Sequence, residues 1–385
     1  MTAETEVYGT SIQRSSDDHV CIITHGDGAN PIITRTLTQI AAASHAVTFL
    51  CWNRLGGPPV FKAPENATVL HLLKGCGRRN LRVAMLLPVF WIRAVIQTLR
   101  VRPRLIYAHA FEGAIPAWIA HRLTGVPYIY HVHDNFSISH KWPIAVRRMW
   151  DAVDEVLFRD SKAVVLPDIC RLLPSCEGSR NKVVVIPNST DVVFFVPPVR
   201  SESTRPLTVA ALGSLEMTRG VDLLLAATKD LRGVRVVAAG HIREKILAKA
   251  ISRQSNWDYL GVIRHAGVER VYREADVVFL FYKPDLDINR LAVPMKLSEA
   301  LSVGRPILMN EEVKLSKRVR DWGVGYTCAY ESRALRACLE EMSGNRFELL
   351  EKASRARTVY DRELSWETHA PKLKELLRRA GCQGR

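Results

Sequence analysis

The chain has 385 residues, more than a single hydrophobic core usually supports, so at least two domains are expected. Hydrophobic residues make up 47% of the chain and charged residues 24%, an ordinary globular composition that excludes an intrinsically disordered protein. The formal net charge of +15 implies an acidic partner, such as nucleic acid, anionic lipid or a phosphorylated substrate.

The cysteines and the N-terminal residues indicate an intracellular setting. Eight cysteines show neither CxxC spacing nor a ligand pattern, which favours free thiols in a reducing compartment over disulfides or zinc. The first residues, MTAETEVYGTSIQRSSDDH, are polar and acidic, unlike a signal or transit peptide. The apolar run Val83–Ile92 is ten residues long and contains a proline, too short to span a bilayer. We therefore expect a cytoplasmic protein.

Short apolar runs alternate with stretches of helical period along the first half of the chain. This alternation is typical of α/β units with a parallel sheet. The strands are expected at residues 20–25, 46–52, 68–73, 105–110, 128–134, 163–167 and 183–188. Helices fit between them, and one over residues 113–125 is closed by Gly125 and followed by Pro127 as stop signals.

The alternation fails at residues 196–206, where proline, serine and charge predict a linker. It then restarts. Strands are expected at residues 207–213, 234–240, 257–261, 275–282, 305–310 and 324–330, followed by a last helix over 365–381. The sequence therefore predicts an α/β fold with two doubly wound domains, residues 1–195 and 206–360, and a C-terminal segment of residues 361–385.

In doubly wound sheets ligands bind beyond the carboxyl ends of the strands, so the residues that follow each strand are candidates. HGDGAN follows the first expected strand. Gly26 and Gly28 would let backbone N–H groups come close to an anion or a sugar at a helix N-terminus. A simple strand-to-helix turn is the alternative, and the dinucleotide pattern GxGxxG is absent.

Three polar residues end the fifth expected strand in YHVHDNF. Strand alternation would place His131 and His133 on one side and Asp134 on the other. A histidine here can donate to a sugar hydroxyl or stabilise developing negative charge. The alternatives are a solvated strand end and a metal site, for which the sequence shows no third inward ligand.

Two cations in the second half are placed to hold a diphosphate. Gly213 ends the first strand of this half, and Arg219 stands at the start of the next helix, where an anion is favoured. In PMKLSEALSVGRPI we expect a helix beginning at Pro294. Lys296 in its first turn opposes the helix dipole, which an anionic ligand would compensate, and Glu299 could accept two ribose hydroxyls. A surface arginine and a solvated Lys–Glu pair are the alternatives.

A basic segment lies between Glu65 and Glu112, where no acidic residue occurs. It combines VAMLLPVFWIRAVIQTL with cations on both sides, which suits adsorption to an anionic membrane. An ordinary domain helix with a basic solvent face is the alternative. The cations that would make the membrane and acceptor patch are Arg78, Arg79, Arg82, Arg93 and Arg100.

The motifs GVPYIYHVHD, KVVVIPNSTD, GSLEMTRGVDLLLAA, YREADVVFLFY and PMKLSEALSVGRPI, in this order, resemble the GT-B retaining glycosyltransferases, family 4 in particular. The resemblance runs from Cys21 to Ser365. It implies two Rossmann-like domains with parallel sheets facing across a cleft and a C-terminal helix returning to the N-terminal domain. A nucleotide-sugar would be held mainly by the C-terminal domain.

By this resemblance, Arg219 and Lys296 would hold the donor diphosphate, and Glu299 would take the ribose. His133, with Asp134 beside it, would act at the transferred sugar. The donor-binding residues would be Gly26, Gly28, Gly213, Arg219, Lys296, Leu297 and Glu299. The family often has a further glutamate where this chain has Leu291, and a cation where it has Ser214.

The implied reaction is a metal-independent transfer, with retention, of a hexose-type sugar from UDP or GDP. The acceptor would be a saccharide or lipid-linked saccharide in polysaccharide biosynthesis, and the enzyme would be cytoplasmic and peripheral on the inner membrane face, without a cofactor. Two alternatives stay open: a sugar-nucleotide epimerase of the same architecture and a basic nucleic-acid-binding protein. Against the second, no nucleic-acid motif is present and the aromatic residues are not interleaved with the cations.

Overall fold

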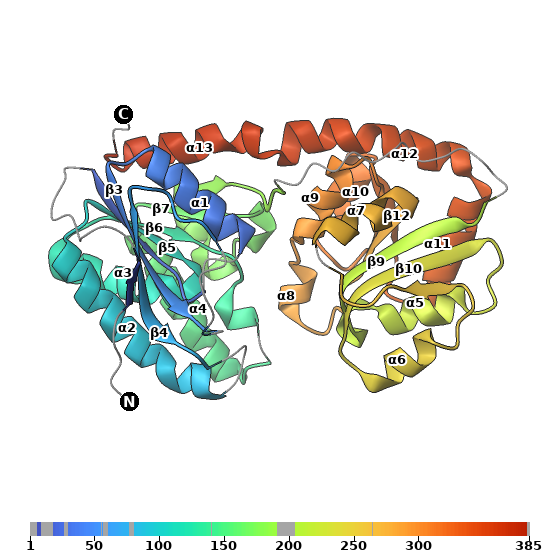
Figure 1. Ribbon diagram of the computed structural model, residues 1–385, viewed down its shortest axis with the longest axis horizontal. Helices are drawn as coiled ribbons and strands as arrows, with labels where there is room; N and C mark the ends of the chain where they lie inside the picture. Colours follow the sequence, from blue (N-terminus) through green and yellow to red (C-terminus); the bar gives the residue numbers. More distant parts are fainter. Residues whose placement is uncertain are drawn as a thin grey trace. The chain divides into compact units, whose positions relative to one another are not determined.

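The computed structural model of the protein describes residues 6–8, 18–26, 30–54, 56, 61–76, 81–139, 141–190, 205–263 and 265–382. The chain divides into two compact units, the first comprising Met1–Pro187 with His369–Arg385 and the second Asn188–Thr368. Both are α/β units (Figure 1). The predicted linker at 196–206 lies almost wholly outside the described residues.

Within its described residues the first unit is built on an eight-stranded sheet of order β1-β4-β3-β2-β5-β6-β7-β8. All neighbouring strands are parallel except β1, which pairs antiparallel with β4 at the edge. The strands are β1 Glu6–Tyr8, β2 His19–Ile23, β3 Ala46–Asn53, β4 Ala67–Lys74, β5 Leu105–His109, β6 Tyr128–His131, β7 Ala163–Leu166 and β8 Val183–Val185. The expected strands are confirmed with small shifts at their ends. β1 was not expected, because a three-residue edge strand in a polar segment has no apolar pattern.

The helices of the first unit follow the strands as a doubly wound fold requires. They are α1 Pro31–Ala42, α2 Leu81–Val101, α3 Ala110–Thr124 and α4 Ile144–Asp160, with the 3₁₀ segments η1 Phe136–Ile138, η2 Ile169–Arg171 and η3 Pro174–Lys182. Helices α2, α3 and α4 pack side by side (Figure 1). Gly125 ends α3 in the left-handed conformation, with φ of 75°, which confirms the predicted stop signal.

Helix α2 is longer than the ten-residue apolar run within it suggested. Pro88 lies inside the helix without ending it, so the helix extends well beyond Val83–Ile92. By length and composition alone Arg82–Val101 could cross a membrane, contrary to the expectation from the ten-residue run. In the structure one face of α2 is packed in the unit: Phe90 stacks on Trp52 of β3, and Ala94 is fully buried.

The described part of the second unit holds a six-stranded parallel sheet of order β11-β10-β9-β12-β13-β14. The strands are β9 Leu207–Leu215, β10 Val234–Ile242, β11 Trp257–Tyr259, β12 Val277–Leu280, β13 Ile307–Asn310 and β14 Gly325–Cys328, again as expected. After β9 the chain adds β10 and β11 on one side of it, and then returns to add β12, β13 and β14 on the other side. The strand order therefore reverses between β9 and β12, where such sheets bind ligands.

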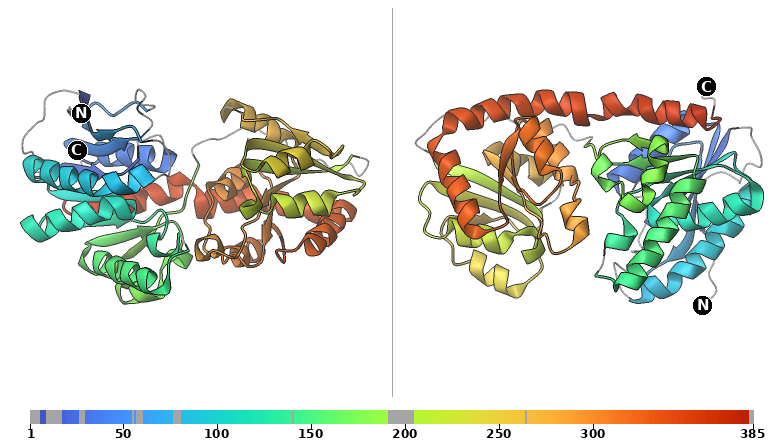
Figure 2. Two further views of the ribbon diagram at one scale, coloured as in Figure 1. Left: turned by 90° about the horizontal axis from the view of Figure 1, so that it is seen from below. Right: turned by 180° about the vertical axis from the view of Figure 1, so that it is seen from behind.

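Both faces of this sheet are covered, which explains its continuous apolar strands. Alternating residues feed two cores, so that Val209 and Ala211 lie in one and Ala210 in the other. The first core is closed by α5 Val221–Thr228, α6 Lys245–Ile251 and α11 Ser332–Gly344, and the second by α7 His265–Glu274, α9 Met295–Ser302 and α10 Ser316–Asp321 (Figures 1 and 2). The remaining helical segments are η4 Met217–Arg219, α8 Asp287–Arg290, α12 Arg346–Val359, η5 Tyr360–Leu364 and α13 Trp366–Arg379.

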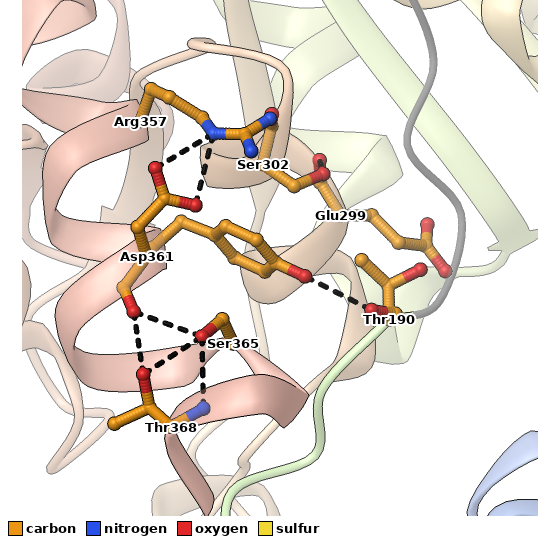
Figure 3. Close-up of polar contacts among 8 residues, drawn as sticks. Thr190, Glu299, Ser302, Arg357, Asp361, Ser365 and Thr368 are labelled. Atoms are coloured by element: carbon orange, nitrogen blue, oxygen red, sulfur yellow. Dashed lines mark hydrogen bonds and ion pairs between the residues drawn. The ribbon is translucent and has the colours of Figure 1, made fainter.

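Helix α9 is held by hydrogen bonds that involve α12, the turn after it and Thr190 (Figure 3). Arg357 binds the Asp361 carboxylate through Nε, at 3.0 and 3.1 Å, and its Nη1 donates to the carbonyl of Ser302 at 2.9 Å. Thr190 bridges this turn and α9. Its carbonyl accepts a hydrogen bond from the Tyr360 hydroxyl at 3.0 Å, and its N–H donates to Ser298 Oγ of α9 at 2.9 Å. These contacts hold α9 at Ser298 and at its last residue, Ser302.

Candidate active site

A pocket of about 220 Å³ lies in the second unit at the reversal of strand order. Its walls come from the carboxyl end of β9, the end of β12 and the residues after it, and the start of α9. The lining residues include Ser214, Arg219, Tyr282, Met295 and Lys296. The two cations predicted to hold a diphosphate are thus brought to one pocket from positions far apart in the sequence.

Arg219 is positioned by an acid and an aromatic ring. Its guanidinium lies 4.4 Å from the centre of the Tyr282 ring, and its Nε is 3.6 Å from Glu216 Oε1. Glu216 also pairs with Arg243, whose Nε is 3.4 Å from Oε2 and equally far from Ser214 Oγ. The planar guanidinium of Arg219 has further N–H groups that can bind a ligand in the pocket. Sequence reasoning missed Tyr282 and Glu216, because neither carries a local signal.

Lys296 crosses the end of β9 because residue 213 is a glycine. A Cβ on Gly213 would stand 2.9 Å from Lys296 Cε and 3.0 Å from Nζ, and the backbone there has φ of +98°. Glycine is therefore needed both for the backbone conformation and for the path of the lysine side chain. Gly213 supports the candidate site through Lys296, which the sequence alone did not indicate.

We expect Gly213→Ala to lower the kcat/KM for sugar transfer about tenfold, by displacing the Lys296 ammonium from its place, roughly 1.4 kcal/mol in transition-state terms. It should also destabilise the fold by about 1–2 kcal/mol through backbone strain. Gly233→Ala is the matched control, because it has φ of +78° and only Ser343 Oγ near a new Cβ, at 3.5 Å. Equal loss of activity in both variants, measured by initial rates and thermal melting, would contradict the role of Lys296.

Two further residues predicted to bind the donor, Leu297 and Glu299, lie on α9. Pro294 is the N-cap, and the helix begins one residue later than expected, at Met295. Glu299 is not among the described residues that line the pocket; its Oε2 accepts from the Tyr272 hydroxyl at 3.0 Å. Burial, with the Glu299 charge, raises the pKa of Tyr272 well above its usual value, so the hydroxyl stays a donor. Leu297 is buried in the core, and its N–H donates to the Pro294 carbonyl, so the structure gives it a packing role.

In the first unit the described residues that follow β2 include Gly26, one of the two glycines expected near the donor. The N–H of Gly26 donates to Thr24 Oγ1 at 3.2 Å, and an added Cβ would meet only ordinary contacts at 3.7 Å. The structure therefore shows no close approach that requires glycine at this position. Gly28 lies outside the described residues.

Three histidines gather at the carboxyl ends of β5 and β6. His109 and His131 are the last residues of these strands, and His133 follows two residues later. Nδ1 of His109 lies 2.8 Å from Nε2 of His133, and Nδ1 of His131 lies 3.0 Å from the Tyr107 hydroxyl. β6 ends at His131, yet His131 and His133 lie together as expected, with ring centres 4.9 Å apart, while Asp134 is exposed.

The environment keeps these rings neutral near pH 7. Burial lowers the pKa of His133 to about 4, and burial together with the neighbouring rings lowers the pKa of His109 and His131 well below the usual value. Asp134 is exposed and pairs with the buried Arg171, with 3.0 Å between Nη1 and Oδ1. A neutral His133 can donate or accept one hydrogen bond at a sugar hydroxyl, depending on its tautomer. The sequence signal for His109 was available, since it too ends an apolar strand with a polar residue.

The predicted basic face of α2 is corrected by the structure. Arg93 points inward and donates from Nη1 to the Leu72 carbonyl at 2.7 Å, whereas Arg82 and Arg100 are exposed near the two ends of the helix. Arg78 and Arg79 lie outside the described residues. The exposed large side chains between the ends are apolar, namely Met85, Val89, Ile92 and Ile96. We call these four residues the outer face of α2; a helix repeat of three to four residues places them on one side.

Two doubly wound units, one with a cationic pocket at its switch point, define a two-domain α/β protein suited to an anionic ligand. Comparison with known proteins identifies the family. A model described as a glycosyl transferase 4-like domain matches residues 27–189, and a model of glycosyl transferases group 1 matches residues 206–345. The chain belongs to these glycosyltransferases and has the GT-B fold.

Individual relatives are distant. A glycogen synthase from Mycobacterium tuberculosis is 23% identical over 296 residues, which cover 70% of this chain and 67% of the relative. Sucrose-phosphate synthase from Thermosynechococcus elongatus matches with a TM-score of 0.75 and 15% identity, covering 94% of this chain and 98% of that one. HepE from Anabaena in complex with UDP-glucose has a TM-score of 0.67 and 14% identity, covering 94% and 100% of the two chains. At these identities the solved structures show the fold.

Proposed function

We propose that this glycosyltransferase moves a hexose-type sugar from a UDP- or GDP-linked donor to a saccharide or lipid-linked acceptor, with retention and without a metal. The observation that carries the proposal is the meeting of Arg219 and Lys296 in one pocket beyond β9 and β12. A diphosphate bears adjacent negative charges, and two fixed cations can neutralise it without Mg²⁺. The solved relative HepE binds UDP-glucose, which supports a nucleotide-sugar as donor.

In the proposed reaction the acceptor hydroxyl attacks the anomeric carbon on the face from which the diphosphate departs. The bond between that carbon and the phosphate oxygen breaks, the new glycosidic bond forms, and the hydroxyl proton passes to the departing phosphate. Arg219 and Lys296 stabilise the negative charge that develops on the leaving group. The neutral His133 holds a hydroxyl of the transferred sugar, and the sugar keeps its anomeric configuration.

The donor is tested by thermal melting of the full chain with nucleotides and nucleotide-sugars. A ligand at 100 times its Kd stabilises the folded state by about 2.7 kcal/mol, enough to raise the Tm measurably. We expect nucleoside diphosphates and their sugars to raise the Tm more than the monophosphates do, because they carry the second phosphate. No shift with any diphosphate up to millimolar concentration would contradict the proposal. Release of the sugar or its epimer without any acceptor would instead indicate the epimerase.

We further propose that the acceptor is lipid-linked and that the enzyme works at the inner face of the membrane, attached through the outer face of α2. Met85 and Ile92 are each 60% exposed, a large apolar surface for one helix of a soluble domain. Arg82 and Arg100 flank this surface near the ends of the helix. Such a face can enter the headgroup region while the arginines contact anionic lipid.

Vesicle sedimentation tests this attachment. We expect the protein to bind phosphatidylglycerol-containing vesicles at low salt and to be released only partly at high salt, because apolar burial is not screened. Ile92→Glu should weaken binding about tenfold or more. Val262→Glu is the matched control, since Val262 is 72% exposed in the second unit and should not contribute. Absence of binding at low salt, or equal binding by both variants, would refute the attachment.

A further inference from the structure

The three histidines at the ends of β5 and β6, which we call the histidine cluster, present more ligand atoms than the proposed transfer reaction uses. His109, His131 and His133 each offer a ring nitrogen, and these atoms all lie within 4.8 Å of one another. His109 is fully buried and His131 nearly so, while His133 is partly open. The transfer reaction needs one of these rings at the sugar, so the gathering of three calls for a separate account.

The hydrogen bonds of the cluster leave lone pairs free for a ligand. In the tautomer in which Nδ1–H of His131 donates to the Tyr107 hydroxyl oxygen, at 3.0 Å, Nε2 keeps its lone pair for a metal, as in other metal-binding histidines. Nε2 of His109 is buried and has no hydrogen-bond partner in the described part of the chain. A buried polar atom without a partner is unfavourable, and a bound ligand would offset that cost.

We propose that the histidine cluster binds one borderline-soft divalent transition metal, with Zn²⁺ as the natural candidate. Neutral imidazoles are preferred ligands of Zn²⁺, and three of them with an open fourth position make a site of known chemistry. Zinc–nitrogen bonds of about 2.0–2.1 Å place ligand nitrogens about 3.4 Å apart in a tetrahedral site. Small rotations of the rings would suffice, because one ring nitrogen of each histidine already lies within 4.8 Å of a ring nitrogen of the other two. The hard cation Mg²⁺, which prefers oxygen ligands, does not fit this donor set.

The consequence for activity rests on the proposed function. A metal that occupies a ring nitrogen of His133 withdraws that ring from the transferred sugar. Metal binding would therefore inhibit sugar transfer, and the site is inhibitory and not a cofactor site. This agrees with a reaction that proceeds without metal on Arg219 and Lys296.

The site is tested by titrating the full, metal-stripped protein with Zn²⁺ in a calorimeter and with Co²⁺ in a spectrophotometer. We expect saturable binding of one equivalent, with visible Co²⁺ absorption of the kind given by nitrogen ligands, and no binding of Mg²⁺. His109→Ala should weaken Zn²⁺ binding more than about tenfold. Tyr107→Phe removes only the partner of His131 and should weaken it about 10- to 100-fold, as loss of an orienting hydrogen bond does.

His45→Ala is the matched control, because His45 is a half-exposed histidine of the same unit, paired with Asp18. It should bind Zn²⁺ as the unaltered protein does, and melting curves establish that the variants are folded. No stoichiometric binding in the unaltered protein, or Zn²⁺ binding in the folded His109→Ala and Tyr107→Phe variants as tight as in the unaltered protein, would overturn the proposed site. These readouts do not need activity, so failure of the transferase proposal would leave them unaffected. Zn²⁺ binding without inhibition would show that His133 is not the sugar contact.

Discussion

Arg219→Ala should lower the kcat/KM for sugar transfer by about 10²–10⁴-fold while leaving the protein folded. The substitution removes the guanidinium and with it two charge-assisted hydrogen bonds to the diphosphate, each worth about 1.5–3 kcal/mol. Each 1.4 kcal/mol of lost transition-state stabilisation lowers the rate about tenfold. The Arg219 side chain is 39% exposed, and its ion partner Glu216 still pairs with Arg243 in the variant, so the free energy of unfolding should change little. Initial rates with a nucleotide-sugar, and the Kd of inorganic pyrophosphate, measure the effect.

Two variants separate geometry from charge. Arg219→Lys keeps the charge but loses the planar fork and the stacking on Tyr282, so it should fall between the alanine variant and the unaltered protein. Arg270→Ala removes a surface arginine that is 73% exposed and pairs with Glu274, and it should transfer sugar normally. An Arg219→Ala protein with unchanged turnover would refute the donor site.

A second large effect is expected from Glu299→Ala, which should lower kcat/KM by about 100-fold or more. From the family resemblance we propose that the carboxylate, which lies on the helix after the pocket residue Lys296, accepts two ribose hydroxyls. Losing both charge-assisted bonds costs about 3 kcal/mol at least. The variant should weaken binding of a nucleoside diphosphate but leave the Kd of inorganic pyrophosphate unchanged, because pyrophosphate has no ribose. Arg219→Ala should weaken binding of both, so the two roles are distinguished by one pair of titrations.

Tyr272 provides the control for Glu299. Its hydroxyl holds Glu299 Oε2 at 3.0 Å, so Tyr272→Phe should loosen the carboxylate and raise KM about tenfold with little change in kcat. Glu299→Gln keeps an acceptor for Tyr272 and should lie between the unaltered protein and Glu299→Ala. If Glu299→Ala affected pyrophosphate and the nucleoside diphosphate alike, the ribose contact would be ruled out and Glu299 would be a structural residue of α9.

Much of the architecture could be predicted from local pattern. Parallel strands buried on both faces read as continuous apolar runs, so each expected strand appears in a sheet. Gly125 could be assigned as a helix end because its left-handed backbone suits glycine. Arg219 and Lys296 could be paired because residues at the carboxyl ends of parallel strands and at the helix starts beyond them meet at one edge of a doubly wound sheet.

What the local pattern could not supply is the direction of individual side chains. Leu297 stands between Lys296 and Glu299 in sequence yet is buried in the core, because a helix turns by about 100° per residue and the packing of α9 decides which face is covered. Arg93 lies in a basic stretch but binds a backbone carbonyl of β4. The outer face of α2 became visible only when the packed face was known.

The sequence by itself determined that the chain holds two α/β units and where their strands lie along it, since these follow from periodicity, and it singled out Arg219 and Lys296 as a pair of candidate cations. Only the tertiary structure decided that His109 joins His131 and His133, that Gly213 makes room for Lys296, and that Glu216 and Tyr282 hold Arg219. These contacts join residues from different strands and turns, and their distances depend on sheet order and side-chain rotamers. The local sequence pattern predicts neither the sheet order nor the rotamers, because both depend on packing across the sheet.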